Sequence, residues 1–203
     1  MTVETWLAFL AAATAMLVIP GPTILLVLGQ SLGGGRSSTL PLVAGVAAGD
    51  ALAMSLSLAG LGALLAASAL AFEALRWAGA AYLVWLGVKL WRAPAEGVPS
   101  PLPPRRAGLQ AFLVTATNPK GIAFFVAFVP QFIDPARPFL PQAGLLVASF
   151  VALGAANALG YALLTGRLSG AVRRPAVRRA LNRTGGTALV GAGLATALLG
   201  RRA

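Results

Sequence analysis

The sequence contains no cysteine and no histidine among its 203 residues. These absences exclude disulfides, thiolate and imidazole metal sites, haem ligation through histidine, and catalysis that depends on either residue. Charge is also scarce, since 10% of the residues are charged and 58% are hydrophobic, against about 25% and about 45–50% in soluble domains. Only five residues are acidic, so sixteen Lys and Arg leave a net charge of +11. The basic charge raises nucleic acid as a partner, but the apolar composition favours a membrane protein.

Long apolar runs dominate the sequence, and a helix needs about 20 mostly apolar residues to cross a bilayer. Six runs meet this need, at about residues 6–28, 40–66, 75–91, 109–132, 139–165 and 184–200. The sequence therefore predicts an all-α integral membrane protein in one membrane domain over residues 1–203. Whether the short, Gly- and Thr-rich last run crosses completely stays open. The first run follows Glu4 instead of a basic segment, so we expect a retained helix and not a signal peptide.

The basic residues gather in alternate connections between these runs. The connections after the first, third and fifth runs hold eleven Lys and Arg and one acid, whereas the opposite side holds four Arg and three acids. Cytoplasmic loops carry the excess of Lys and Arg, so we expect the odd-numbered loops in the cytoplasm and both termini outside. The net charge is thus explained by membrane orientation, and no nucleic-acid partner is predicted.

A proline-rich segment at 93–108 divides the chain into two parts, 1–92 and 109–203, with three runs each. The second and fifth runs align without a gap and place Asp50 on Asn157. Repeats of three spans insert with opposite orientation, and inverted repeats with broken helices are typical of transporters that bind substrate near the midplane. We therefore predict six transmembrane helices as two inverted three-helix repeats.

Proline breaks the first and fourth runs. Proline frees the carbonyl four residues earlier, so Pro20 and Pro22 release Met16 and Val18, and Pro119 releases Thr115. Unsatisfied backbone persists in a bilayer only beside protein or water. The two breaks therefore predict a binding site, with a packed kink as the alternative.

Two charged residues fall inside the predicted spans, where charge is costly and marks function. At about 1.5 Å per residue, Asp50 and Lys120 both lie about 15 Å from the cytoplasmic end of their runs. Opposite charges beside free helix ends suit a zwitterion, which indicates an amino acid. Asp50 is also the predicted proton-coupling residue. The predicted substrate-binding residues are Pro20, Gly21, Pro22, Thr23, Asp50, Thr117, Asn118, Pro119, Lys120 and Asn157.

Other functions stay open at this stage. A cation exporter would use Asp50, Asn157 and freed carbonyls as hard oxygen ligands. An integral membrane enzyme lacks clear nucleophile and base candidates, and a lipid scaffold leaves the buried charges unexplained. We predict no enzyme, no cofactor and no bound metal. The predicted partners are a small-molecule substrate and the lipid bilayer, with a homo-oligomer left open.

Several motifs carry a resemblance over nearly the whole chain. They are the PGP at 20–22, the glycine-rich start of the second run, GAAYLVWLGVKLWR at 79–92, TNPKG at 117–121 and FVPQFIDP at 128–135. With these motifs in this order, the chain resembles the LysE/RhtB family of bacterial amino-acid and metabolite exporters. The resemblance implies an inner-membrane exporter with six hydrophobic segments, driven by the proton or ion gradient without an ATPase. The family does not always have an acid at position 50, so the role of Asp50 is inferred from its burial.

Overall fold

The computed structural model describes residues 1–19, 21–93, 102–172 and 174–199, and every element in these ranges is helical. The elements are α1 (Val3–Val18), α2 (Pro22–Gly34), η1 (Gly35–Ser38), α3 (Thr39–Ala67), α4 (Ala69–Arg92), α5 (Pro104–Ala116), α6 (Pro119–Ala127), η2 (Val129–Phe132), α7 (Phe139–Val172) and α8 (Pro175–Leu199). The predicted all-α class is confirmed for the described residues.

Each predicted apolar run corresponds to a helix or to a broken pair of helices. By length and composition, α3, α7 and the segment from α5 to η2 could cross a membrane, and the pair α1 and α2, bent by 56°, could form a fourth span. The helices extend beyond several predicted ends, and α7 continues to Val172. Hydropathy marks only the apolar part of a helix, whereas its ends continue through residues that favour helix without being apolar.

The predicted linker ends earlier in the structure than the sequence indicates. The linker was expected to reach residue 108, but α5 already begins at Pro104. Proline suits the first helical position because its fixed φ matches the helix and its missing N–H needs no partner there. Residues 94–101 of the predicted linker lie outside the described residues.

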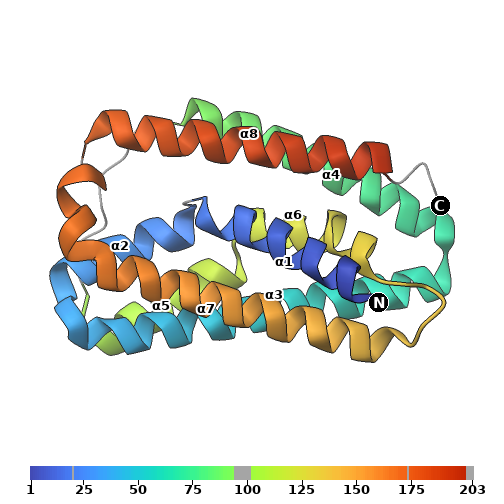
Figure 1. The fold of residues 1–203 in the computed structure, drawn as a ribbon, viewed down its shortest axis with the longest axis horizontal. Coiled ribbons are helices and arrows are strands. Elements are labelled where there is room, and N and C mark those ends of the chain that lie inside the picture. The colour runs from blue at the N-terminus through green and yellow to red at the C-terminus, as the bar shows by residue number, and fades with distance from the viewer. Residues whose placement is uncertain (20, 94–101, 173, 200–203) are drawn as a thin grey trace.

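The long helices lie side by side along the longest axis of the molecule (Figure 1). Helix α4 packs along α8 at one edge, α3 packs along α5 at the opposite edge, and α7 contacts both α2 and α3. Between these edges lie α1 and α6 (Figure 1). Elements from the two sides of the linker are therefore interleaved, and one part of each broken helix, α1 and α6, lies in the middle of the bundle (Figure 1).

Glycines allow the closest helix contacts. A Cβ atom on Gly49 of α3 would lie 2.7 Å from Cβ of Thr115 and 2.8 Å from the carbonyl oxygen of Phe112 on α5. On the other edge, a Cβ atom on Gly87 of α4 would lie 2.6 Å from the carbonyl oxygen of Gly186 on α8. Small residues let membrane helices approach closely. The glycine-rich start of the second run therefore packs closely on α5.

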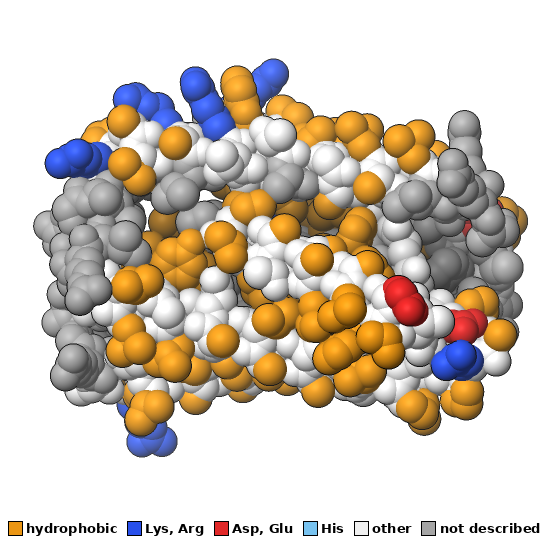
Figure 2. Space-filling model, viewed as in Figure 1, with side chains coloured by type: hydrophobic (Ala, Val, Ile, Leu, Met, Phe, Trp, Pro, Cys, Tyr) orange, Lys and Arg blue, Asp and Glu red, His pale blue; other side chains and the backbone are white. Residues whose placement is uncertain are grey.

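The surface is strongly apolar. Large hydrophobic side chains are exposed on most of the long helices, with exposed fractions up to 79% at Leu70 and Leu140. Figure 2 shows hydrophobic side chains along the length of the bundle, most Lys and Arg toward one end, and the acidic groups in view toward the other. Soluble monomers rarely expose apolar areas of this extent, so this surface is suited to contact with lipid.

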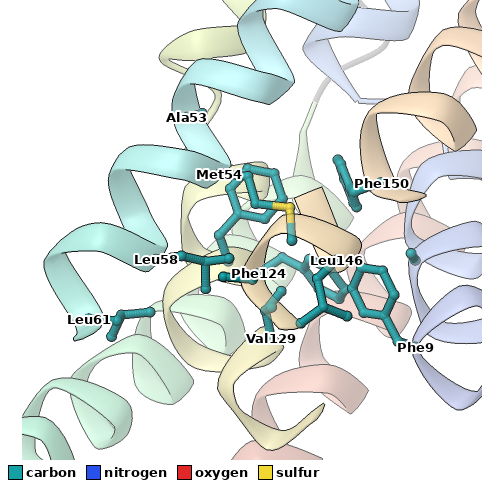
Figure 3. Close-up of a cluster of buried hydrophobic side chains, with 12 residues drawn as sticks. Phe9, Ala53, Met54, Leu58, Leu61, Phe124, Val129, Leu146 and Phe150 are labelled. Atoms are coloured by element: carbon teal, nitrogen blue, oxygen red, sulfur yellow. The ribbon is translucent and has the colours of Figure 1, made fainter. Parts of the chain in front are cut away.

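A buried aromatic cluster joins α1, α6 and α7. Phe150 of α7 packs edge-on against Phe125, with ring centroids 4.9 Å apart, and lies 6.0 Å from Phe124. Met54 and Leu58 of α3 reach the same cluster (Figure 3). These side chains close one side of the space beside the helix breaks.

Candidate functional site at the two helix breaks

The first break lies between α1 and α2. The last residue before Pro20 is Ile19, which is extended with φ −71° and ψ 113°, because a following proline disfavours the helical region. Helix α2 then begins directly at Pro22. The break therefore presents the carbonyl end of α1 and the amide end of α2 to the same region.

Side chains bind all four carbonyl groups at the end of α1. The Lys120 ammonium donates to the carbonyl oxygens of Met16 at 3.0 Å and of Ile19 at 2.9 Å. Two side chains of α7 complete the set. Asn157 Nδ2 donates to Leu17 O at 3.0 Å, and the Tyr161 hydroxyl donates to Val18 O at 2.8 Å.

This arrangement explains why α1 can end inside the bundle. Helix ends leave four carbonyls without a partner, and lipid offers none. The positive charge of Lys120 also lies at the negative end of the α1 dipole.

The second break lies between α5 and α6 and is bonded locally. Asn118 caps α6, because its side-chain oxygen accepts from Lys120 N at 3.1 Å. The Thr115 carbonyl, which Pro119 deprives of its helical partner, accepts from Asn118 N at 3.1 Å. Thr117 donates from its hydroxyl to Leu113 O at 2.7 Å. The second break thus leaves little free backbone.

Hydrogen bonds join the two breaks directly. The Thr23 hydroxyl at the start of α2 lies 3.3 Å from the Thr115 hydroxyl at the end of α5. It also accepts from Asn118 Nδ2 at 3.2 Å. All three side chains are buried. Features almost a hundred residues apart in the sequence therefore form one polar centre.

A small cavity of about 30 Å³ lies at this centre, with Asp50 and Lys120 in its wall. Both are 7% exposed. Within the described part of the chain, no hydrogen bond or ion pair of the Asp50 carboxylate is found, although it interacts electrostatically with Lys120. The expected opposite charges are therefore neighbours, but the Lys120 ammonium bonds to α1 carbonyls and does not contact Asp50 directly.

Two glycines make room for these charged side chains. A Cβ atom on Gly154 would lie 2.5 Å from Oδ2 of Asp50, and one on Gly21 would lie 3.3 Å from Nζ of Lys120. Only a residue without a side chain fits at position 154 while Asp50 keeps its place.

The structure brings together most of the predicted site residues. The residues that line the small cavity are Gly21, Thr23, Asp50, Asn118, Lys120 and Asn157. The side chains of Pro22, Thr117 and Pro119 are exposed and do not line it. Pro22 and Pro119 contribute to the site by interrupting the helical backbone and not through their side chains. Pro20 lies outside the described residues.

Tyr161 and Gly154 belong to this site, although sequence reasoning did not select them. Both are on α7, one helical turn after and one before Asn157, and so share its face. That spacing is the signal that could have found them. Ile24, Val46, Gly121 and Phe150 also line the cavity.

The class of protein follows from these features. Apolar helices, an apolar surface and a polar centre between two broken helices define a helical membrane protein. The sequence model of the LysE type translocator matches residues 14–200. The chain therefore belongs to the LysE type translocator family, which confirms the resemblance of its motifs.

Similar proteins cover nearly the whole chain. It is 36% identical over 203 residues to the homoserine/homoserine lactone efflux protein of Salmonella typhimurium, covering 97% of this chain and 98% of that protein. It is 37% identical over 198 residues to an uncharacterized membrane protein of Vibrio cholerae, covering 96% and 97%. The leucine efflux protein of Salmonella choleraesuis is 32% identical over 166 residues, covering 78% and 77%. No solved structure matches the chain.

Proposed function

We propose that this protein exports an amino acid or a similar small metabolite across the bacterial inner membrane, driven by the proton or another ion gradient. Family membership supports a translocator. The relatives named for efflux of homoserine, homoserine lactone and leucine support amino acids and their derivatives as the substrate class. No enzymatic step is proposed.

The observation that carries this proposal is the Asp50 carboxylate, which is buried in the small cavity without a hydrogen-bond partner among the described residues. A carboxylate in such a place can bind the ammonium group of a substrate or a coupling proton. The amides of Thr23 and Ile24 lie in the first turn of α2, which carries the positive end of its dipole. They would bind the substrate carboxylate.

We further propose that the two halves, 1–92 and 109–203, insert as inverted three-helix repeats with the site near the midplane. Six spans then include α4 and α8. The odd-numbered loops are cytoplasmic and the termini are outside, as the distribution of Lys and Arg favours. Alternating access would come from rocking of one half against the other around the two breaks.

The test is efflux from vesicles that contain purified protein and are loaded with a panel of labelled amino acids, under an imposed pH gradient. We expect Asp50→Asn to reduce gradient-driven efflux at least about tenfold, which corresponds to about 1.4 kcal/mol of lost stabilisation. Asp134→Asn is the matched control, because Asp134 pairs with Arg137 in a surface loop. Wild-type rates in Asp50→Asn would exclude this role for Asp50.

The alternative of a cation exporter makes a different prediction. Asp50, Asn157 and backbone carbonyls would then bind a metal ion, and titration of the purified protein with divalent cations would show saturable binding that Asp50→Asn abolishes. The four α1 carbonyls already accept hydrogen bonds from side chains. We therefore favour the amino-acid substrate.

A further inference from the structure

A second, larger cavity lies between α1, α6 and α8, with a volume of about 180 Å³. Its walls are almost entirely apolar, with Ala12 and Ala15 on α1, Phe124 on α6, and Gly185, Leu189 and Ala192 on α8. The proposed binding of the charged groups of the substrate does not use this space.

The two cavities share part of their walls. Met16 and Lys120 line both of them. The larger cavity follows α1 from Ile19 at the break back to Ala12, so it extends from the polar centre along one helix. A molecule whose polar part lies at the break can therefore reach the apolar cavity with another part.

The two cavities differ in size, so they suit different parts of a ligand. The small cavity, at about 30 Å³, has room for little more than one water molecule. The larger one, at about 180 Å³, exceeds the engineered apolar cavity of about 150 Å³ that stays dry and binds benzene. It can therefore accept an apolar group with about six carbon atoms.

We propose that the cavity between α1, α6 and α8 is a specificity pocket for the side chain of the substrate, which is an amino acid with a large apolar side chain. This inference rests on the proposed function, because it places the ammonium and carboxylate groups at the breaks. The Lys120 side chain lies against both cavities, so the substrate lies across it. The substrate ammonium then lies at the Asp50 carboxylate in the small cavity, and the substrate side chain lies in the larger one.

Continuity with a charged centre distinguishes this occupant from a lipid tail. A lipid acyl chain would gain nothing from Lys120, whereas an amino acid joins an apolar group to charged groups within a few bonds. The wall residues on α1 and α8 are small, with Ala12, Ala15, Gly185 and Ala192. Larger side chains at these positions would fill the space that the substrate needs.

The experiment compares efflux of leucine, methionine and phenylalanine with efflux of alanine and threonine from loaded vesicles. Ala12→Leu fills the cavity, and Ala11→Leu is its matched control on an exposed neighbouring position of the same helix. We expect wild type to prefer the large apolar substrates. We expect Ala12→Leu to reduce the ratio of leucine to alanine efflux about tenfold or more, and Ala11→Leu to leave it unchanged.

Leu189→Ala enlarges the same cavity and tests the proposal in the opposite direction, by raising the ratio of phenylalanine to leucine efflux. This arm applies even if Ala12→Leu does not fold. Equal loss of every substrate in Ala12→Leu and an unchanged ratio in Leu189→Ala, as a lipid tail in the cavity would give, would overturn the pocket and leave the exporter function standing. Absence of efflux of every amino acid by wild type would overturn both.

Discussion

Gly154 on α7 gives the Asp50 carboxylate of α3 its place, because a Cβ atom at position 154 would lie 2.5 Å from Oδ2 of Asp50. The two residues belong to opposite halves of the chain and line the same cavity. The position of the Asp50 carboxylate therefore depends on the absence of a side chain at position 154.

Gly154→Ala should accordingly impair transport without changing any charge. The added methyl group displaces the carboxylate, and a misplacement of about 1 Å in a site can cost about a hundredfold in rate. We expect efflux to fall about tenfold to a hundredfold, measured in loaded vesicles.

Gly160→Ala is the matched control for this prediction. It makes the same change on the same helix, and its Cβ atom meets nothing within 4 Å. Efflux by Gly160→Ala should equal that of wild type. If both variants transport at the wild-type rate, then efflux does not depend on the observed position of the Asp50 carboxylate.

Lys120→Met should destabilise the fold. Methionine keeps much of the apolar volume of lysine but leaves the carbonyls of Met16 and Ile19 without their donor. Hydrogen bonds to charged groups contribute about 1.5–3 kcal/mol each, and we expect a loss of about 3 kcal/mol, seen as a lower melting temperature in detergent. Lys89→Met is the control, since Lys89 is exposed and lies over the Trp85 ring at 5.0 Å. An equal effect of the two changes would contradict the role of Lys120 at the end of α1.

Tyr161→Phe removes a single hydroxyl and thus a single hydrogen bond, to the carbonyl oxygen of Val18. Because lipid provides no substitute donor, we expect a loss of about 1–2 kcal/mol in the free energy of unfolding. Tyr82→Phe changes an exposed tyrosine on α4 and should have no measurable effect. Unfolding in denaturant compares the two, and an unaffected Tyr161→Phe would show that the Val18 carbonyl needs no partner.

Gly49→Ala should push α3 and α5 apart. Its Cβ atom would lie 2.7 Å from Cβ of Thr115, and overpacking of this kind costs about 1–3 kcal/mol. Thr115 also contacts Thr23, so efflux should fall along with stability. Gly60→Ala lies on the same helix with nothing within 4 Å and should retain both. A stable, active Gly49→Ala would show that the helices separate without cost.

The helix breaks could be predicted from the sequence because their cause is local. A proline acts on the carbonyl four residues before it, so Pro20 and Pro22 alone indicate that Met16 and Val18 need other partners. The structure supplies those partners from Lys120 and Tyr161. Which side chains would do so was not predictable, because that depends on how α6 and α7 pack against α1.

The burial of two charged side chains could also be predicted from the sequence, because Asp50 and Lys120 lie within long apolar runs. The sequence placed these two opposite charges at the same depth, with a substrate between them. In the structure the Lys120 ammonium donates to backbone carbonyls of α1. These carbonyls form the negative end of the α1 helix dipole. The larger cavity had no sequence signal, because the alanine and glycine in its wall are common throughout this sequence.

Asn118 uses both ends of one planar amide. Its oxygen holds the first turn of α6, and its nitrogen holds Thr23 in the first turn of α2. The amide is rigid between these two atoms, so it keeps Thr23 close to the first turn of α6. Any tilt of α2 against α6 that separates Thr23 from Asn118 would have to break this hydrogen bond.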